Sequence, residues 1–180
     1  MAHWYLALLL GALQLASPFQ MPMKPGALSG LMRRHSISIE QKFDANGQAI
    51  PLSKRLIGIS AYDEARAGAS AAGEVMAVRF MGQRCPHCKR MGIRWNKMIR
   101  EFQEESIGVR FFDVEMMESK DTVRAVKEET GDGLDALPWI IIYDDKGKGR
   151  HSFACGSSKT GELKQKLLDT VHDVATEAST

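Results

Sequence analysis

Residues 75–102 of the 180-residue chain read VMAVRFMGQRCPHCKRMGIRWNKMIREF, and this stretch decides the fold. Its first seven residues are nearly all apolar, which is typical of a central strand buried on both faces of a sheet. Pro86 then suits the first turn of a helix, because the N–H group that proline lacks would have no partner there. Further along, apolar side chains recur at spacings of three and four and predict one buried stripe: Met91, Trp95, Met98, Ile99 and Phe102. The stretch therefore predicts a buried strand that passes directly into an amphipathic helix led by Cys85.

The segments on either side predict a single α/β domain. Apolar and β-branched runs indicate strands at residues 56–59, 75–81, 109–114, 138–143 and 150–155. Helices are expected to follow four residues that suit a helix start: Ser60, Cys85, Ser119 and Ser158. Gly131 is expected to end the third helix, and DDKGKG at residues 144–149 predicts the turn of a hairpin. In chain order this gives β-α-β-α-β-α-β-β-α, an α/β sandwich.

The chain has three cysteines, Cys85, Cys88 and Cys155, which are too few for a disulfide framework. A metal site is not predicted, because zinc needs four ligands and there is one Cys-x-x-Cys pair. Unpaired N–H groups and the helix dipole favour an anion at a helix start, so we expect Cys85 to be held as a thiolate. Cys88 is expected on the same side and less exposed. Cys85 would then attack a substrate and Cys88 would resolve the mixed disulfide; the alternative is two inert helical cysteines.

Two further side chains near this pair have two interpretations each. His87 can donate a hydrogen bond to the Cys85 sulfur or hold a positive charge near it, or it can simply occupy the helix start. Cys155 can be a regulatory thiol or a small buried hydrophobic residue. Pro86 and His87 are counted with the two cysteines as candidate catalytic residues.

Four features carry a resemblance: the strand–CPHC–helix unit, Leu137-Pro138 opening a strand fifty residues later, the hairpin, and SSKTGELKQKLLDTV as the closing helix. By these features residues 55–176 resemble the thioredoxin family. The resemblance implies a thioredoxin fold, with a central mixed β-sheet flanked by helices and no bound cofactor. It implies that Pro138 is a cis-proline beside the disulfide, that the backbone of Leu137 pairs with the substrate, and that Gly156 borders the substrate groove. The implied partners are protein thiols or disulfides and a reductase or oxidase that exchanges electrons.

Two residues depart from the thioredoxin pattern. Arg84 stands where that family has a tryptophan, and Arg79 stands where it has a buried aspartate. Each positive charge that faces the thiols lowers the pKa of Cys85 and makes the disulfide more oxidising. Arg79 and Arg84 are therefore candidate redox-tuning residues, and an oxidase or isomerase is favoured over a reductase. The alternative for Arg79 is a side chain that extends to the protein surface. The alternative function is a non-catalytic binding or assembly module.

The N-terminal residues differ in composition from the domain. Residues 1–17 contain a short apolar core followed by small residues, as in a signal peptide. Residues 18–54 resemble a transit peptide or a disordered linker, and no Asp or Glu occurs before Glu40. We therefore expect the protein to be targeted out of the cytosol, either to the secretory pathway or endoplasmic reticulum lumen, or to a plastid through a two-part leader.

The overall composition excludes several classes of protein. Apolar residues make up 44% of the chain and charged residues 26%, which is typical of a globular domain. A formal net charge of +2, without a basic stripe interleaved with aromatic residues, does not favour nucleic-acid binding. No stretch reaches the roughly 20 apolar residues that a membrane span needs. Nothing in the sequence calls for more than a monomer.

Overall fold

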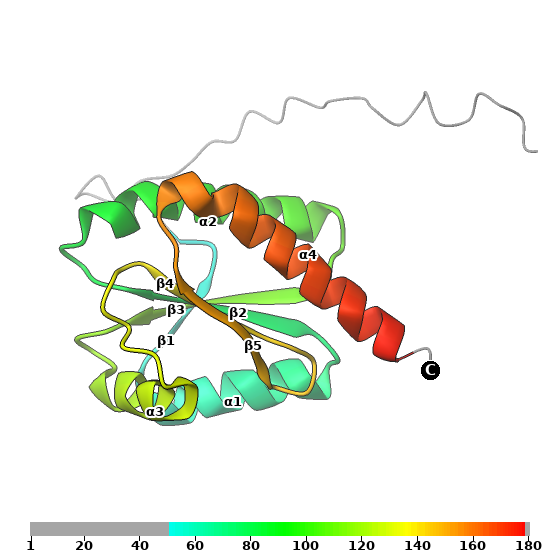
Figure 1. Cartoon of the computed structure of the whole chain (residues 1–180), viewed down its shortest axis with the longest axis horizontal. Coiled ribbons are helices and arrows are strands. Elements are labelled where there is room, and N and C mark those ends of the chain that lie inside the picture. The colour runs from blue at the N-terminus through cyan, green and yellow to red at the C-terminus, as the bar shows by residue number, and fades with distance from the viewer. Residues whose placement is uncertain (1–50, 179–180) are drawn as a thin grey trace, which may run out of the picture. The chain divides into compact units, whose positions relative to one another are not determined.

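The computed structural model describes residues 51–178, and these form a five-stranded mixed sheet between two pairs of helices (Figure 1). The strands are β1 (Lys54–Leu56), β2 (Val75–Met81), β3 (Val109–Glu115), β4 (Trp139–Tyr143) and β5 (Gly149–Ala154). The α-helices are α1 (Gly58–Ala71), α2 (Pro86–Glu104), α3 (Lys120–Thr130) and α4 (Thr160–Glu177). This arrangement confirms the expected element order and the α/β class.

Strand β2 occupies the centre of the sheet, whose order is β1-β3-β2-β4-β5. It runs parallel to β3 and antiparallel to β4. Six of its seven residues are buried, because helices cover both faces. Cys85, which follows the end of β2, therefore lies at the middle of one edge of the molecule.

Two hydrophobic clusters hold the helices to the sheet. Helices α2 and α4 cover one face, where Trp95, Phe102 and Leu167 pack against alternate residues of the strands. Helices α1 and α3 cover the other face, where Tyr62 and Val126 pack against the remaining strand residues. Alternation of side chains along each strand explains why one strand supplies both clusters.

The start of the domain differs from the prediction. Strand β1 covers residues 54–56 rather than 56–59, and Ser60 lies inside α1 instead of capping it. The free N–H groups at the start of α1 are bound by residues distant in sequence: Gly58 donates to Ser119 Oγ at 3.3 Å and Ile59 donates to the Asp121 carboxylate at 3.1 Å. The start of α3 thus supplies the caps of α1, and a local pattern at Ser60 could not reveal this.

The ends of the last two helices also refine the prediction. Gly131 ends α3 in the left-handed region, with φ of 71°, as expected. A short 3₁₀ segment, Ser157–Lys159, precedes α4, so the final helix begins at Thr160, one residue later than a start directly after Ser158. Among the described residues no helix is both long and apolar enough to span a membrane.

Candidate active site

Cys85 and Cys88 form a disulfide at the start of α2, with Cα atoms 5.2 Å apart. Cys85 is the N-cap of the helix, and the backbone N–H of Cys88 donates to its sulfur at 3.1 Å. Pro86 occupies the first helical turn, where its missing N–H leaves nothing unsatisfied. Cys88 is 1% exposed, whereas Cys85 is half-buried, so a second protein can reach the Cys85 sulfur and not the Cys88 sulfur.

A second loop lies against the disulfide. The Leu137–Pro138 peptide bond is cis, and the carbonyl oxygen of Leu137 lies 3.7 Å from the Cys85 sulfur. The N–H of Cys155 donates to the carbonyl oxygen of Pro138 at 2.8 Å, which brings Gly156 to the same loop cluster. The structure therefore brings together residues that are up to 71 positions apart in the sequence, from Cys85 to Gly156.

Gly82 allows the two loops to approach closely. A Cβ atom at this position would lie 3.3 Å from a methyl group of Leu137, which is tighter than ordinary contact. The same Cβ would lie 3.8 Å from the Cβ of Cys85. A larger residue at position 82 would push the Leu137 side chain away from the disulfide.

A cavity of about 510 Å³ opens beside Cys85. Leu137 and Met117 give it an apolar lining, and the exposed residue Arg84 lies at its edge. Glu115 also lines this cavity; its carboxylate accepts hydrogen bonds from the backbone N–H groups of Gln83 and Glu118. An extended peptide that carries a cysteine could place a neighbouring apolar side chain here.

Comparison with known proteins supports this geometry. A family model described as thioredoxin matches residues 63–169, more than half of the chain, including both cysteines and Pro138. The chain belongs to the thioredoxin family. No curated protein sequence matches it.

Solved thioredoxins share the fold of the chain at low sequence identity. The thioredoxin of Fasciola hepatica is 16% identical, with a TM-score of 0.54 over 65% of this chain and 98% of that one. A thioredoxin from Nicotiana alata is 21% identical, with a TM-score of 0.51 over 68% of this chain and 97% of that one. At these identities the likeness establishes the thioredoxin fold and not a particular substrate.

Two residues expected to assist the cysteines, His87 and Arg84, are both exposed. His87 is exposed, and its Nδ1 accepts a hydrogen bond from Arg90 at 2.9 Å. Arg84 is exposed beside the cavity. The catalytic and tuning roles of His87 and Arg84 remain predictions.

Arg79 does not extend to the surface, so that alternative is wrong. Arg79 is 2% exposed. Its Nε and Nη2 donate to the carboxylate of Asp113 at 2.9 and 2.7 Å. Ser53 Oγ donates to the same carboxylate at 2.6 Å, and Trp95 Nε1 donates to Ser53 Oγ at 3.3 Å. Asp113 and Ser53 were not predicted as partners of Arg79, although an Asp inside the apolar strand at residues 109–114 already indicates a buried polar partner.

Cys155 is fully buried, which favours a small hydrophobic residue over a regulatory thiol. Burial raises the pKa of its thiol to about 11, so it is protonated near neutral pH. A protonated buried thiol is a poor nucleophile.

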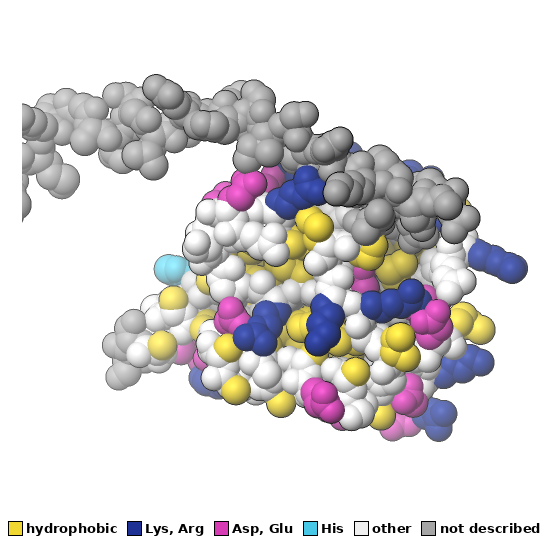
Figure 2. Space-filling model, turned by 180° about the vertical axis from the view of Figure 1, so that it is seen from behind, with side chains coloured by type: hydrophobic (Ala, Val, Ile, Leu, Met, Phe, Trp, Pro, Cys, Tyr) yellow, Lys and Arg dark blue, Asp and Glu magenta, His cyan; other side chains and the backbone are white. Residues whose placement is uncertain are grey.

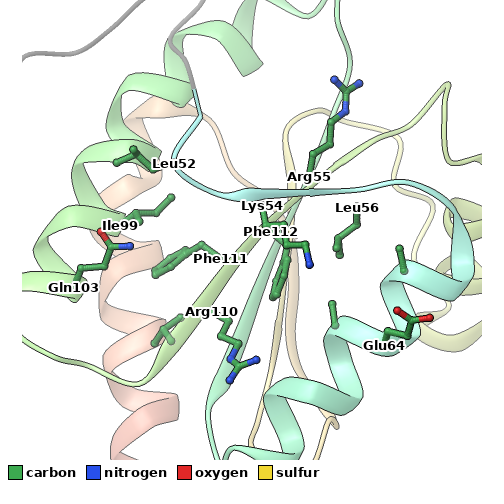
Figure 3. A pocket seen from close by; sticks show the side chains of 13 residues that line it. Leu52, Lys54, Arg55, Leu56, Glu64, Ile99, Gln103, Arg110, Phe111 and Phe112 are labelled. Atoms are coloured by element: carbon green, nitrogen blue, oxygen red, sulfur yellow. The ribbon is translucent and has the colours of Figure 1, made fainter.

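A second cavity lies at the β1 edge of the sheet, away from the disulfide. It measures about 580 Å³, and Figure 3 shows Phe111 and Ile99 beside it. Lys54, Arg55 and Arg110 line it, and Figure 2 shows Lys and Arg side chains spread among apolar ones on the side of the molecule seen from behind. None of the described residues that line this cavity is a cysteine.

Proposed function

We propose that this protein is a thiol–disulfide oxidoreductase that exchanges disulfides with protein substrates through Cys85 and Cys88. The observation that carries the proposal is the unequal burial of the two bonded sulfurs, with Cys85 accessible at the helix start and Cys88 buried behind it. The Leu137–Pro138 loop beside Cys85 supplies a backbone carbonyl and an apolar cavity for the substrate chain. Leu137, Pro138 and Gly156 are accordingly proposed as substrate-binding residues.

The proposed reaction balances without a cofactor. A substrate thiolate attacks the Cys85 sulfur, a substrate–Cys85 bond forms, and the Cys85–Cys88 bond breaks with its electron pair leaving on Cys88. A second substrate thiolate then attacks the substrate sulfur of the mixed disulfide, and Cys85 leaves as a thiolate. Two electrons pass to the protein, and the substrate gains a disulfide. An oxidase partner must remove these two electrons before the next cycle.

The sequence of steps runs in reverse when the protein acts as a reductase. In that direction the Cys85 thiolate attacks a substrate disulfide and Cys88 displaces the reduced substrate. The N–H of Cys88 and the start of α2 stabilise negative charge on Cys85 and so favour the reduced dithiol form. Stabilising the reduced form makes the couple more oxidising, and the charge of Arg84 at the cavity beside Cys85 acts in the same direction, so we propose an oxidase or isomerase role over a reductase role.

Insulin reduction and the oxidative refolding of a reduced, disulfide-containing protein test the proposal. Cys85→Ser is expected to abolish both activities, because the accessible sulfur is gone. Cys155→Ala is the matched control, since it removes a cysteine that cannot react while leaving the pair intact. If the wild type shows neither activity, so that Cys85→Ser changes nothing, the protein is a binding or assembly module instead; activity that survives in Cys85→Ser contradicts the role of Cys85.

We further propose that residues 1–54 direct the protein out of the cytosol. The apolar core and the acid-poor stretch in this segment support the proposal. A fusion of residues 1–54 to a fluorescent protein tests it in the native cell: signal in the endoplasmic reticulum lumen or outside the cell favours oxidative folding, plastid signal favours redox regulation, and cytosolic signal contradicts it.

A further inference from the structure

A buried ion pair lies beneath the redox helix. The side chains of Arg79 on β2 and Asp113 on β3 are 3% and 4% exposed, and the two residues face each other in the parallel ladder. The ring of Trp95 on α2 covers the guanidinium, with 5.4 Å between Cζ and the ring centroid. The pair therefore lies in the layer between the sheet and α2, and not at the protein surface.

The guanidinium extends toward the disulfide end of this layer. Its Nη2 contacts the sulfur of Met81 at 3.6 Å, two residues further along β2 in the direction of Cys85. Trp95 and Cys88 lie seven residues apart, two turns along the same buried face of α2. The Cys88 sulfur and the guanidinium thus share one dry layer, in which charges act over longer distances than in water.

One nitrogen of Arg79 has no partner. Nη1 is buried and makes no hydrogen bond in the described structure. A buried donor without an acceptor is costly and uncommon, so a second state in which it is used would explain its retention. Reduction of the disulfide creates such a state, because it places a new acceptor, the Cys88 thiolate, in the same layer.

We propose that Arg79 stabilises the thiolate of Cys88 in the reduced protein, with Nη1 as its free donor, and that Asp113 limits this effect by neutralising part of the Arg79 charge. Arg79 is thus a positioning residue that acts through Cys88. The inference rests on the proposed function, since it concerns the same disulfide.

Arg79 is expected to act on the first step of thiol–disulfide exchange. When a substrate thiolate attacks Cys85, the Cys85–Cys88 bond breaks and Cys88 leaves with the electron pair. A leaving thiol of lower pKa departs faster, so Arg79 speeds the oxidation of substrates and shifts the equilibrium toward the reduced protein. Removing Asp113 strengthens this effect, and removing Arg79 reverses it.

Two measurements on the protein alone test the proposal. The first is the pKa of Cys88, followed by ultraviolet absorbance of the thiolate in a Cys85→Ser background, where Cys155 titrates at higher pH. The second is the equilibrium of the Cys85–Cys88 pair with glutathione in the otherwise unchanged chain. Arg79→Met is expected to raise the pKa of Cys88 by about one unit and to make the couple less oxidising, by up to about tenfold when the equilibrium is measured above that pKa. Asp113→Asn is expected to shift both quantities in the opposite direction.

Two further variants complete the test. Arg79→Lys keeps the charge and is expected to retain most of the effect; if Arg79→Met does not fold, the shift in Asp113→Asn carries the test. Arg94→Gln is the matched control, because it removes an exposed arginine of α2, the helix that carries Cys88, and is expected to change neither quantity. Shifts of the same sign in the Arg79 and Asp113 variants, or shifts no larger than that of Arg94→Gln, overturn the proposal. Neither readout requires a protein substrate, so failure here differs from failure of the proposed activity.

Discussion

At the scale of single residues, the two bonded cysteines differ in burial, and this difference sets their order of reaction. The sequence predicted it, because Cys88 was expected one turn inside the helix and less exposed than Cys85 at its start. The sequence could not predict the contacts of Arg79, because its partner Asp113 lies 34 residues away and is brought alongside by the sheet register. Arg79 was expected either to face the thiols or to extend to the surface, and only this long-range pairing with Asp113 excludes the second possibility.

The burial of Cys155 leads to a prediction about thiol reactivity. In the reduced native protein, an alkylating reagent is expected to modify Cys85 quickly and Cys155 only after denaturation, since the Cys155 thiol is buried and its pKa is raised to about 11. Mass spectrometry of the alkylated peptides over time measures this. Rapid modification of Cys155 in the folded protein would show that the loop at residues 154–156 opens freely.

At the scale of helices and strands, the elements with local signals were predicted well. Strand β2, helix α2 and the end of α3 at Gly131 follow from hydrophobic pattern, Pro86 and a glycine in the left-handed region. The start of α1 was predicted wrongly because its N–H groups are bound by Ser119 and Asp121 of a distant helix. Helix caps supplied by tertiary contacts leave no mark in the local sequence.

The β4–β5 hairpin gives a prediction of pH-dependent stability. Burial alone would raise the pKa of Asp144, but hydrogen bonds from the Lys148 N–H, the Arg150 guanidinium and the Lys146 N–H lower it below its ordinary value. A carboxylate with a lowered pKa stabilises the fold above that ordinary value of 3.8, and the contribution is lost as the pH falls further. Asp144→Ala is expected to cost about 2 kcal/mol near neutral pH.

Urea unfolding across a range of pH measures this contribution. The difference between the wild type and Asp144→Ala is expected to shrink as the pH falls toward and below 3.8. The neighbouring variant Asp145→Ala is the matched control, since Asp145 is not held by these three donors. A difference that stays constant with pH would mean that Asp144 acts through packing and not through its charge.

At the scale of the whole molecule, local sequence patterns predict the fold class, but they do not predict how the residues of the site come together. The α/β class follows from element order alone, whereas the arrangement of Cys85, Leu137 and Gly156 depends on the sheet order β1-β3-β2-β4-β5, which local patterns do not encode. The resemblance to thioredoxins predicted that Pro138 and Gly156 lie near the disulfide, but the strand order itself comes from the structure. The leader was predicted over residues 1–54. Residues 1–50 lie outside the described residues, so that part stays a prediction, whereas Ser53 and Lys54 belong to the domain.

The second compact unit, Ile39–Thr180, contains every residue of the two hydrophobic clusters found among the described residues, so we predict that this unit folds without residues 1–38. A chain that begins at Ile39, where the second compact unit starts, is expected to unfold at the same temperature as the full chain and to keep the same exchange activity. Thermal unfolding followed by circular dichroism measures the first quantity. A clear loss of stability on truncation would show that the N-terminal residues add to the core.

The most direct measurement is the trapping of a mixed disulfide. The reduced Cys88→Ser variant is incubated with insulin whose disulfides are intact. The cysteine that becomes linked to insulin is identified by peptide mass mapping. Because Cys85 carries the accessible sulfur and the resolving sulfur is absent, one stable adduct is expected on Cys85 and none on Cys155. An adduct on Cys155, or no adduct on Cys85, would contradict the assignment of Cys85 as the attacking group.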